Sequence, residues 1–115
     1  MRFVLSWMVV GVMACGSAGV GGDRTSTIAD LDGDVANGEA VYTANCVVCH
    51  LTDGTGETNG GVGDDLVLAF SESDDDLEYI DVILNGEGEM TAFGSSLEDQ
   101  DIADLMAYMR DAFGG

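Results

Sequence analysis

The chain has 115 residues, enough for one small domain once any leader is removed. A formal net charge of −19 disfavours nucleic acid and anionic lipid headgroups as partners, although such a charge also suits simple solubility. With 17 glycines, no proline and 7% aromatic residues, the side chains offer only a thin hydrophobic core. A buried planar cofactor would supply the apolar surface that they lack.

Residues 1–14 are predicted to be a signal peptide. Arg2 provides a positive charge, and the following apolar run ends at Met13. This run is too short to span a bilayer comfortably and matches the apolar region of a secretory leader. Export would place the protein outside the cytoplasm.

Cys15 is the predicted lipidation site. It follows Ala14 at the end of the apolar run, and this arrangement resembles the cleavage site of bacterial lipoproteins, in which the cysteine is acylated. Several acyl chains on one cysteine would anchor the protein stably. The alternatives are an ordinary signal peptide, cut after Ala14 or Ala18, and an uncleaved anchor helix. Residues 15–33, rich in Gly, Ser, Thr and Asp, are predicted to be a flexible, lipid-anchored linker.

Residues 34–113 are predicted to form the folded domain, and its first helix covers residues 34–46. Asp34 is the expected N-cap, and apolar residues recur at helical spacing. A glycine inside a helix, as at Gly38, is unfavourable by up to about 1 kcal/mol relative to alanine. Its presence predicts close packing of this helix against another helix.

The end of the first helix carries Cys46, Cys49 and His50 in the pattern C-x-x-C-H, which is typical of covalent attachment of c-type haem. Two thiols three positions apart can each form a thioether with one vinyl group of a porphyrin. The adjacent imidazole can then bind the iron. The cofactor predicted from these residues is one covalent haem c.

Three other interpretations of the same residues remain. A redox dithiol is one, although the common dithiol fold uses a cis-proline and this chain has no proline. A zinc site is another. These residues supply three good ligands, so a carboxylate would have to serve as the fourth. A structural disulfide between Cys46 and Cys49 would close a loop too short to stabilise the fold much.

Residues 51–71 are predicted to form a long glycine-rich loop, and such a loop in a small domain needs a reason. Wrapping a haem is one, with the apolar residues 66–70 pressing on the ring. Those residues are also compatible with a short buried strand or a helical turn. The second helix is predicted over 74–84, with Ser73 as N-cap, Asp76 in the capping-box position and an end at Asn85-Gly86.

Met90 is the predicted sixth ligand of the iron. The chain has one histidine, so ligation by two histidines from this chain is excluded if His50 binds the iron. Met90 lies in a loop flanked by glycines, whereas Met106 and Met109 fall on an apolar helix face and are expected in the core. Alternatively, Met90 packs over the haem edge and leaves the iron open to a small gas.

The third helix is predicted over residues 97–113. Its apolar face repeats every three or four positions, and a capping box is expected from Ser95 with Glu98 or from Ser96 with Asp99. Arg110 suits the C-terminal end of the helix, and Gly114 would stop it.

The domain resembles a small bacterial mono-haem class I cytochrome c. The matching segments are residues 38–42, 46–50, 63–66, 83–86, 90–94 and 102–110. The resemblance implies an all-α fold of three main helices and long loops around one haem, with Gly38 meeting Tyr108 where the first and last helices cross. It further implies thioether bonds to Cys46 and Cys49, axial ligation by His50 and Met90, and electron transfer without enzyme activity.

Two positions depart from the family pattern. Thr91 replaces the usual proline after the distal methionine, and Asp64 replaces the proline of the haem loop. The second proline's neighbourhood normally supplies a carbonyl to the proximal histidine, so here that carbonyl would come from Gly63 or Asp64.

The sequence therefore predicts a one-electron carrier on the periplasmic side of a bacterial membrane. We expect it to be lipid-anchored, or alternatively soluble in the periplasm, with redox protein partners that present basic docking surfaces and with no nucleic-acid partner. The alternatives are a haem domain with an open or labile sixth position for gas binding or sensing, and a haem subunit of a larger redox complex.

Overall fold

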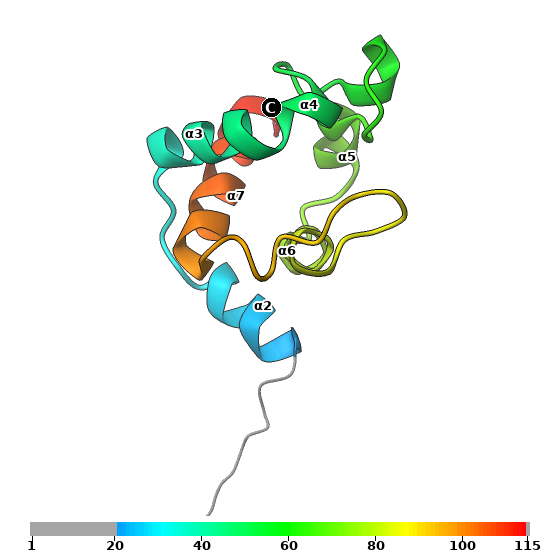
Figure 1. Ribbon diagram of the computed structural model, residues 1–115. Coiled ribbons are helices and arrows are strands. Elements are labelled where there is room, and N and C mark those ends of the chain that lie inside the picture. The colour runs from blue at the N-terminus through cyan, green and yellow to red at the C-terminus, as the bar shows by residue number, and fades with distance from the viewer. Residues whose placement is uncertain (1–20, 115) are drawn as a thin grey trace, which may run out of the picture.

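The computed structural model describes residues 21–114, and this part of the chain is built from helices and loops (Figure 1). The helices are α2 (Gly21–Ala29), α3 (Val35–Asn45), α4 (Val47–His50), the 3-10 helix η2 (Gly56–Asn59), α5 (Leu66–Glu72), α6 (Asp76–Asn85) and α7 (Asp99–Phe113). Between residues 21 and 114 there is no strand, only an isolated bridge between Glu87 and Met90. None of these helices is long and apolar enough to cross a membrane. The predicted signal peptide, residues 1–14, and Cys15 lie outside the described residues.

Helices α3 and α7 cross and make the most extensive contact between helices in the described chain (Figure 1). A Cβ atom on Gly38 would lie 1.9 Å from the carbonyl oxygen of Asp104 and 2.7 Å from the Cβ of Tyr108. Any side chain at this position would therefore hold the two helices apart. The predicted meeting of Gly38 with Tyr108 is confirmed.

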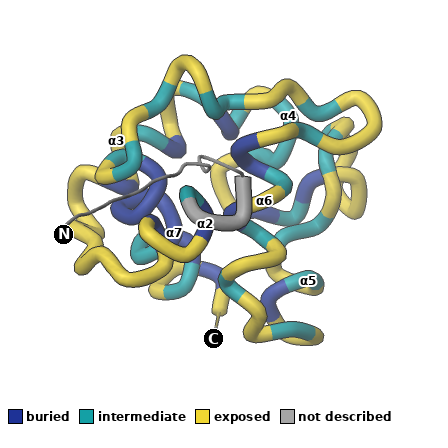
Figure 2. Tube along the Cα trace, turned by 90° about the horizontal axis from the view of Figure 1, so that it is seen from below, coloured by how far each residue is buried: buried dark blue, intermediate teal, exposed yellow. Residues whose placement is uncertain are grey.

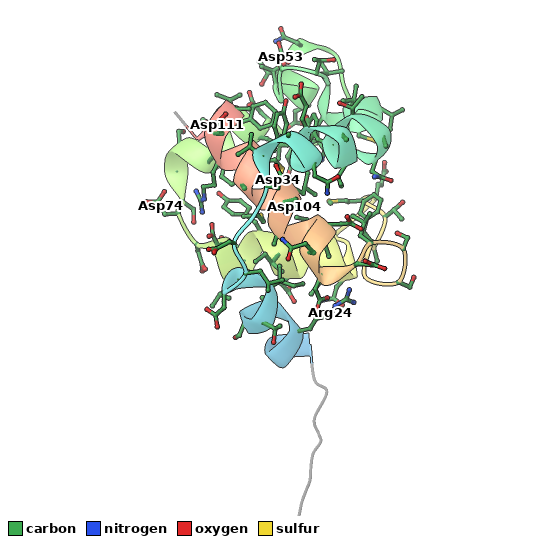
Figure 3. The ribbon with its side chains drawn as sticks, turned by 90° about the vertical axis from the view of Figure 1, so that its left-hand side faces the viewer. Arg24, Asp34, Asp53, Asp74, Asp104 and Asp111 are labelled. Atoms are coloured by element: carbon green, nitrogen blue, oxygen red, sulfur yellow. The ribbon has the colours of Figure 1, made fainter. Side chains whose placement is uncertain are left out.

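The crossing also contains Asp104, a carboxylate that is only 3% exposed. Its oxygens accept hydrogen bonds from the backbone N–H of Asp34 (2.7 Å), the Asn37 side chain (2.7 Å) and the Gln100 side chain (2.9 Å). Asp34 is the predicted N-cap of α3 and accepts from the N–H of Ala36. One network thus fixes the beginning of α3 to α7, and Figure 3 shows Asp34 beside Asp104.

The hydrophobic core is centred on α7, around which the buried positions gather in Figure 2. The predicted apolar face of this helix is buried, which confirms that prediction. The residues are Ile102, Leu105, Met106, Met109 and Phe113. Tyr42 of α3 packs its ring 5.4 Å from that of Phe113, and its hydroxyl donates to the Leu51 carbonyl.

Helices α6 and α7 begin later than the sequence predicts. The N-cap of α6 is Asp75 and not Ser73, because the Asp75 carboxylate accepts from the N–H groups of Leu77 and Glu78. The Ser73 hydroxyl instead accepts from the N–H of Asp75, in the turn before the helix.

At α7, the capping box is formed by Glu98 and Asp101. The predicted boxes from Ser95 or Ser96 are therefore wrong. Carboxylates compete well for the free N–H groups at the start of a helix, where the helix dipole favours negative charge. In a chain this rich in acidic residues, several neighbouring carboxylates could serve, and local sequence does not select among them.

The prediction that residues 15–33 are a flexible linker is wrong for residues 21–29. These residues form α2, which packs on α6 and α7 at the bottom of Figure 1. Ile28 is 1% exposed and Thr25 is also buried. The composition of the segment has little intrinsic helix preference, so the docking of one apolar residue onto two other helices stabilises it.

Candidate haem-binding site

A cavity of about 340 Å³ opens between α4, α5, α6, α7 and the Met90 loop, which we define as residues 86–98 between α6 and α7. This volume falls in the range of roughly 300–1,000 Å³ that is common for cofactor sites. Its apolar walls are Leu66 and Phe70 from α5, Val82 and Ile83 from α6, and Leu105 and Met109 from α7. The predicted contact of the 66–70 segment with a cofactor therefore has a structural basis.

Cys46, Cys49 and His50 lie on one continuous turn after α3. The N–H of Cys46 donates to the Tyr42 carbonyl (2.8 Å), and the N–H of His50 donates to the Cys46 carbonyl (2.9 Å). Cys46 and His50 line the cavity. Cys49 is partly buried and lies on the same turn, although it is not among the lining residues.

The environment of the buried Cys46 thiol does not suit the reactive cysteine of a redox dithiol. Burial, with a smaller effect from neighbouring Cys49, raises the pKa of the Cys46 thiol to about 11. A reactive dithiol needs an accessible sulfur with a lowered pKa, because the thiolate is the nucleophile. Between residues 21 and 114, no group of three or more His, Cys, Asp and Glu side chains is placed to hold a metal ion.

The His50 ring is held on two sides by the loop that follows it. Its Nδ1 lies 2.8 Å from the carbonyl oxygen of Asp64, one of the two carbonyls predicted for this contact. A carbonyl can only accept, so Nδ1 carries the proton and Nε2 is the free nitrogen. Gly63 lies against the ring, and a Cβ there would be 2.7 Å from the Cε1 atom of His50.

Hydrogen bonds fold the loop into a scaffold without proline. The backbone N–H of Gly63 donates to the Cys49 carbonyl, and the Gly63 carbonyl accepts from Glu57 in η2, both at 2.8 Å. Asp65 then caps α5 through the N–H of Leu68, and it accepts from the Thr58 hydroxyl. These bonds place the Asp64 carbonyl beside His50.

Met90 lies on the Met90 loop and lines the same cavity as Cys46 and His50. The loop turns tightly, with Gly86 at a φ of +76° and a hydrogen bond from the N–H of Met90 to the Glu87 carbonyl. Two N–H groups farther along, those of Phe93 and Gly94, donate to the last carbonyls of α6. The structure thus brings the predicted distal residue to the site from 40 positions beyond His50.

The other two methionines of the described chain behave as predicted. Met106 and Met109 are both buried in the core on the apolar face of α7. Met109 has a second place that the sequence did not predict, because it also forms part of the cavity wall.

The charged residues that line the cavity are all acidic: Asp64, Glu72, Glu78 and Glu87. The two acidic residues just before Met90, Glu87 and Glu89, are both exposed, and of the two only Glu87 lines the cavity. Arg110 lies behind the wall, 5.0 Å from the ring centre of Phe70.

Two residues that shape the site were not predicted from the sequence. Tyr79 donates from its hydroxyl to the carbonyls of Ala69 and Ser73, which fixes α5 against α6. Arg24 of α2 donates to carbonyls of the Met90 loop. Neither residue stands in a motif, and for Arg24 the contacts depend on the tertiary fold, so no local signal could have identified them.

Comparison with known proteins identifies the class. Residues 33–109 match the family described as cytochrome c oxidase, cbb3-type, subunit III, and the chain belongs to this family of mono-haem class I cytochromes c. The site fits the cofactor of that family, because the thiol of Cys46, the imidazole of His50 and the thioether of Met90 surround one apolar cavity. The predicted all-α fold is confirmed.

Individual relatives are cytochromes c6. The chain is 36% identical over 84 residues to cytochrome c6 of Diacronema lutheri, covering 71% of this chain and all of the relative. It is 34% identical to cytochrome c6 of Porphyra purpurea, covering 78% of each chain. For cytochrome c6 of Thermosynechococcus vestitus the identity is 33%, covering 74% of this chain and 76% of the relative. No solved structure matched the chain significantly.

Membership in this family assigns one covalent haem c to the chain and makes it an electron carrier rather than an enzyme. The predictions of haem c and of a non-enzymatic role are thereby confirmed.

Proposed function

We propose that the protein is a one-electron carrier outside the cytoplasm, with haem bonded to Cys46 and Cys49 and with His50 and Met90 as axial ligands of the iron. The observation that carries this proposal is the single cavity that Cys46, His50 and Met90 line together. Haem iron with histidine and methionine ligands cycles between two oxidation states, at a potential raised by the methionine.

His50 would serve as a neutral, oriented ligand. The Nδ1–H donates to the Asp64 carbonyl, and Gly63 packs on the ring, so the imidazole has little freedom to rotate. A hydrogen bond at Nδ1 also increases the basicity of Nε2. Both effects would favour binding of Nε2 to the iron in one orientation.

The apolar walls would exclude water from the cofactor, and water access and local polarity tune the potential of a metal site. The four lining carboxylates would act in the opposite sense to the methionine, because negative charge favours the ferric state. All four, Asp64, Glu72, Glu78 and Glu87, are exposed, so solvent screens their effect.

The test is the visible spectrum of the full chain, produced in a host that attaches haem c. We expect a sharp α band in the reduced protein and a weak far-red band from methionine sulfur on ferric iron. Met90→Leu should abolish the far-red band, whereas the matched control Met106→Leu, in the core, should retain it. A wild-type protein without that band would exclude ligation by Met90.

A haem domain with a labile sixth position is the second candidate function. Two observations favour it: Met90 is only partly buried, and exposed Thr91 follows it in place of proline. Carbon monoxide separates the two candidates. Fast and complete binding to the ferrous protein at neutral pH would favour gas binding, and slow or incomplete binding would favour the carrier.

The proposed location is the periplasmic side of a bacterial membrane, with a lipid anchor at Cys15. Support comes from the leader-like residues 1–14. Because α2 begins at Gly21, only residues 16–20 separate the anchor from the fold, a reach of at most about 20 Å. Cys15→Ser should release the protein from membranes, and a variant that stays bound would contradict the anchor.

The proposed partners are redox proteins with basic docking surfaces, because this chain has 22 acidic residues and only three basic ones. The family description names an oxidase subunit, so a haem subunit of a larger redox complex is the alternative setting. Co-purification of the tagged full chain from membranes distinguishes the two, because a free carrier would elute alone.

A further inference from the structure

The Met90 loop has no proline to restrict it, yet it is fixed on both sides at Gly94. The backbone N–H of Gly94 donates to the Leu84 carbonyl at the end of α6 (3.1 Å). The Gly94 carbonyl accepts a hydrogen bond from the guanidinium of Arg24 (2.5 Å). Gly94 lies four positions after Met90, so these two bonds limit how far the methionine can move.

Arg24 belongs to α2, 70 positions before Gly94 in the sequence. Its guanidinium also donates to the Leu97 carbonyl (3.1 Å) and to the carboxylate of Asp99, the first residue of α7 (2.7 Å). Figure 3 shows Arg24 where α2 meets the gold loop and the beginning of α7. One side chain therefore connects three segments, α2, the Met90 loop and the beginning of α7.

The geometry of this contact matters more than its charge. The Arg24 side chain is 35% exposed, and an ion pair with that exposure stabilises a fold only weakly. The planar guanidinium, however, offers donors in fixed directions, and here they reach two backbone carbonyls and one carboxylate. A lysine, with one ammonium group, could not hold all three.

We propose that Arg24 is a positioning residue for the bond between Met90 and the haem iron. This proposal rests on the ligation by Met90 proposed above. A thioether bond to iron competes with an open state in which the loop moves away. By restricting the loop in both states, Arg24 lowers the conformational entropy that the open state would gain, so the bound state is more populated.

Arg110 provides a matched comparison within the described chain. It also pairs with an acidic side chain, Asp76, and donates to a backbone carbonyl, that of Asp74. Its hydrogen bonds lie at the beginning of α6 and in the turn before it, and its guanidinium also lies over the rings of Phe70 and Tyr79. It makes no hydrogen bond with the Met90 loop. Substitution of either arginine therefore removes a guanidinium, an ion pair and carbonyl contacts, but only one substitution affects the loop.

The experiment measures imidazole binding to the ferric full-chain holoprotein together with its far-red band. Without Arg24, the open state is more populated, so Arg24→Leu should bind imidazole about tenfold more tightly and show a weaker band. Arg110→Leu should stay within about twofold of wild type. Arg24→Lys keeps the positive charge near Asp99 but lacks the planar guanidinium with its several donors. Its affinity for imidazole should therefore lie between those of wild type and Arg24→Leu.

The proposal is overturned if Arg24→Leu retains the wild-type band and imidazole affinity, even if that variant unfolds more easily. It is equally overturned if Arg110→Leu changes both properties as much. A wild-type holoprotein that lacks the far-red band would contradict ligation by Met90 itself. These results are distinguishable, because only the last one is seen without any substitution.

Discussion

At the scale of single residues, hydrogen bonds hold the loops of the site, which contain no proline. The His50 ring donates a hydrogen bond to the Asp64 carbonyl. Backbone hydrogen bonds of Gly63 with Cys49 and Glu57 hold that carbonyl in place. Tight packing also restricts the ring, because the space between position 63 and the imidazole is too small for any side chain larger than that of glycine. A chain without proline can therefore still hold an imidazole ring in one orientation.

Asp104 leads to a prediction on stability and pH. Burial alone would raise the pKa of this carboxyl, but hydrogen bonds from Gln100, the Asp34 backbone and Asn37 lower it below its usual value. A carboxylate whose pKa is lowered by folding stabilises the protein above the unfolded pKa, about 3.9, and this stabilisation disappears as the pH falls through the folded pKa.

Asp104→Asn should therefore lower the free energy of unfolding at pH 7 by about 1.5–3 kcal/mol, because three donors lose a charged acceptor. The deficit relative to wild type should shrink as the pH is lowered below about 4. Urea unfolding of the holoprotein from pH 7 to pH 3 measures both effects. The control Asp30→Asn, at an exposed position, should change little. A deficit that does not vary with pH would contradict the explanation.

At the scale of elements, α2 shows how tertiary contacts make a helix from an unpromising segment. Its residues include glycine, serine and two threonines, which favour turns over helices. The helix nevertheless packs on α6 and α7, with Ile28 buried in the core, and Arg24 binds the Met90 loop. The helix is part of the fold that surrounds the site, and it precedes the segment, residues 33–109, that matches the family.

Ile28→Ala distinguishes a docked helix from a linker. Loss of a side chain that is 1% exposed should lower the free energy of unfolding by about 2–4 kcal/mol. Ser26→Ala, at an exposed position of the same helix, should change it by less than about 0.5 kcal/mol. Chemical unfolding of the two variants under identical conditions makes the comparison, and equal stabilities would show that α2 is not docked in solution.

At the scale of the whole molecule, negative charge is in large excess over positive charge. The two arginines in the described part of the chain are both engaged internally, Arg24 with Asp99 and Arg110 with Asp74 and Asp76. Most of the 22 acidic residues remain without a basic partner, so the protein presents a strongly negative field to anything that approaches it.

This field predicts opposite salt effects for small reagents of opposite charge. Electron transfer with cationic hexaammineruthenium should slow severalfold as ionic strength rises from about 10 mM to 200 mM, because salt screens the attraction. Electron transfer with the anionic hexacyanoferrate couple should accelerate over the same range. Stopped-flow rates at constant pH provide the measurement. Equal salt dependence for both reagents would mean that the charge near the electron-transfer site is not negative.

The sequence alone determined the features that are local. The C-x-x-C-H motif, the N-cap at Asp34, the apolar face of α7 and the end of α6 at Gly86 each depend on residues within a few positions of one another. The meeting of Gly38 with Tyr108 was also predicted, because a glycine inside a helix needs a packing reason and the family resemblance supplied the partner.

The tertiary structure alone decided the features that depend on distant partners. Whether the carbonyl of Gly63 or that of Asp64 would accept from His50, and whether residues 21–29 would fold, were both settled by contacts between segments of the folded chain. The link from Arg24 to Gly94 joins residues 70 positions apart. Hydrogen bonds and packing between distant segments form only when the helices are in place, so no local pattern encodes them.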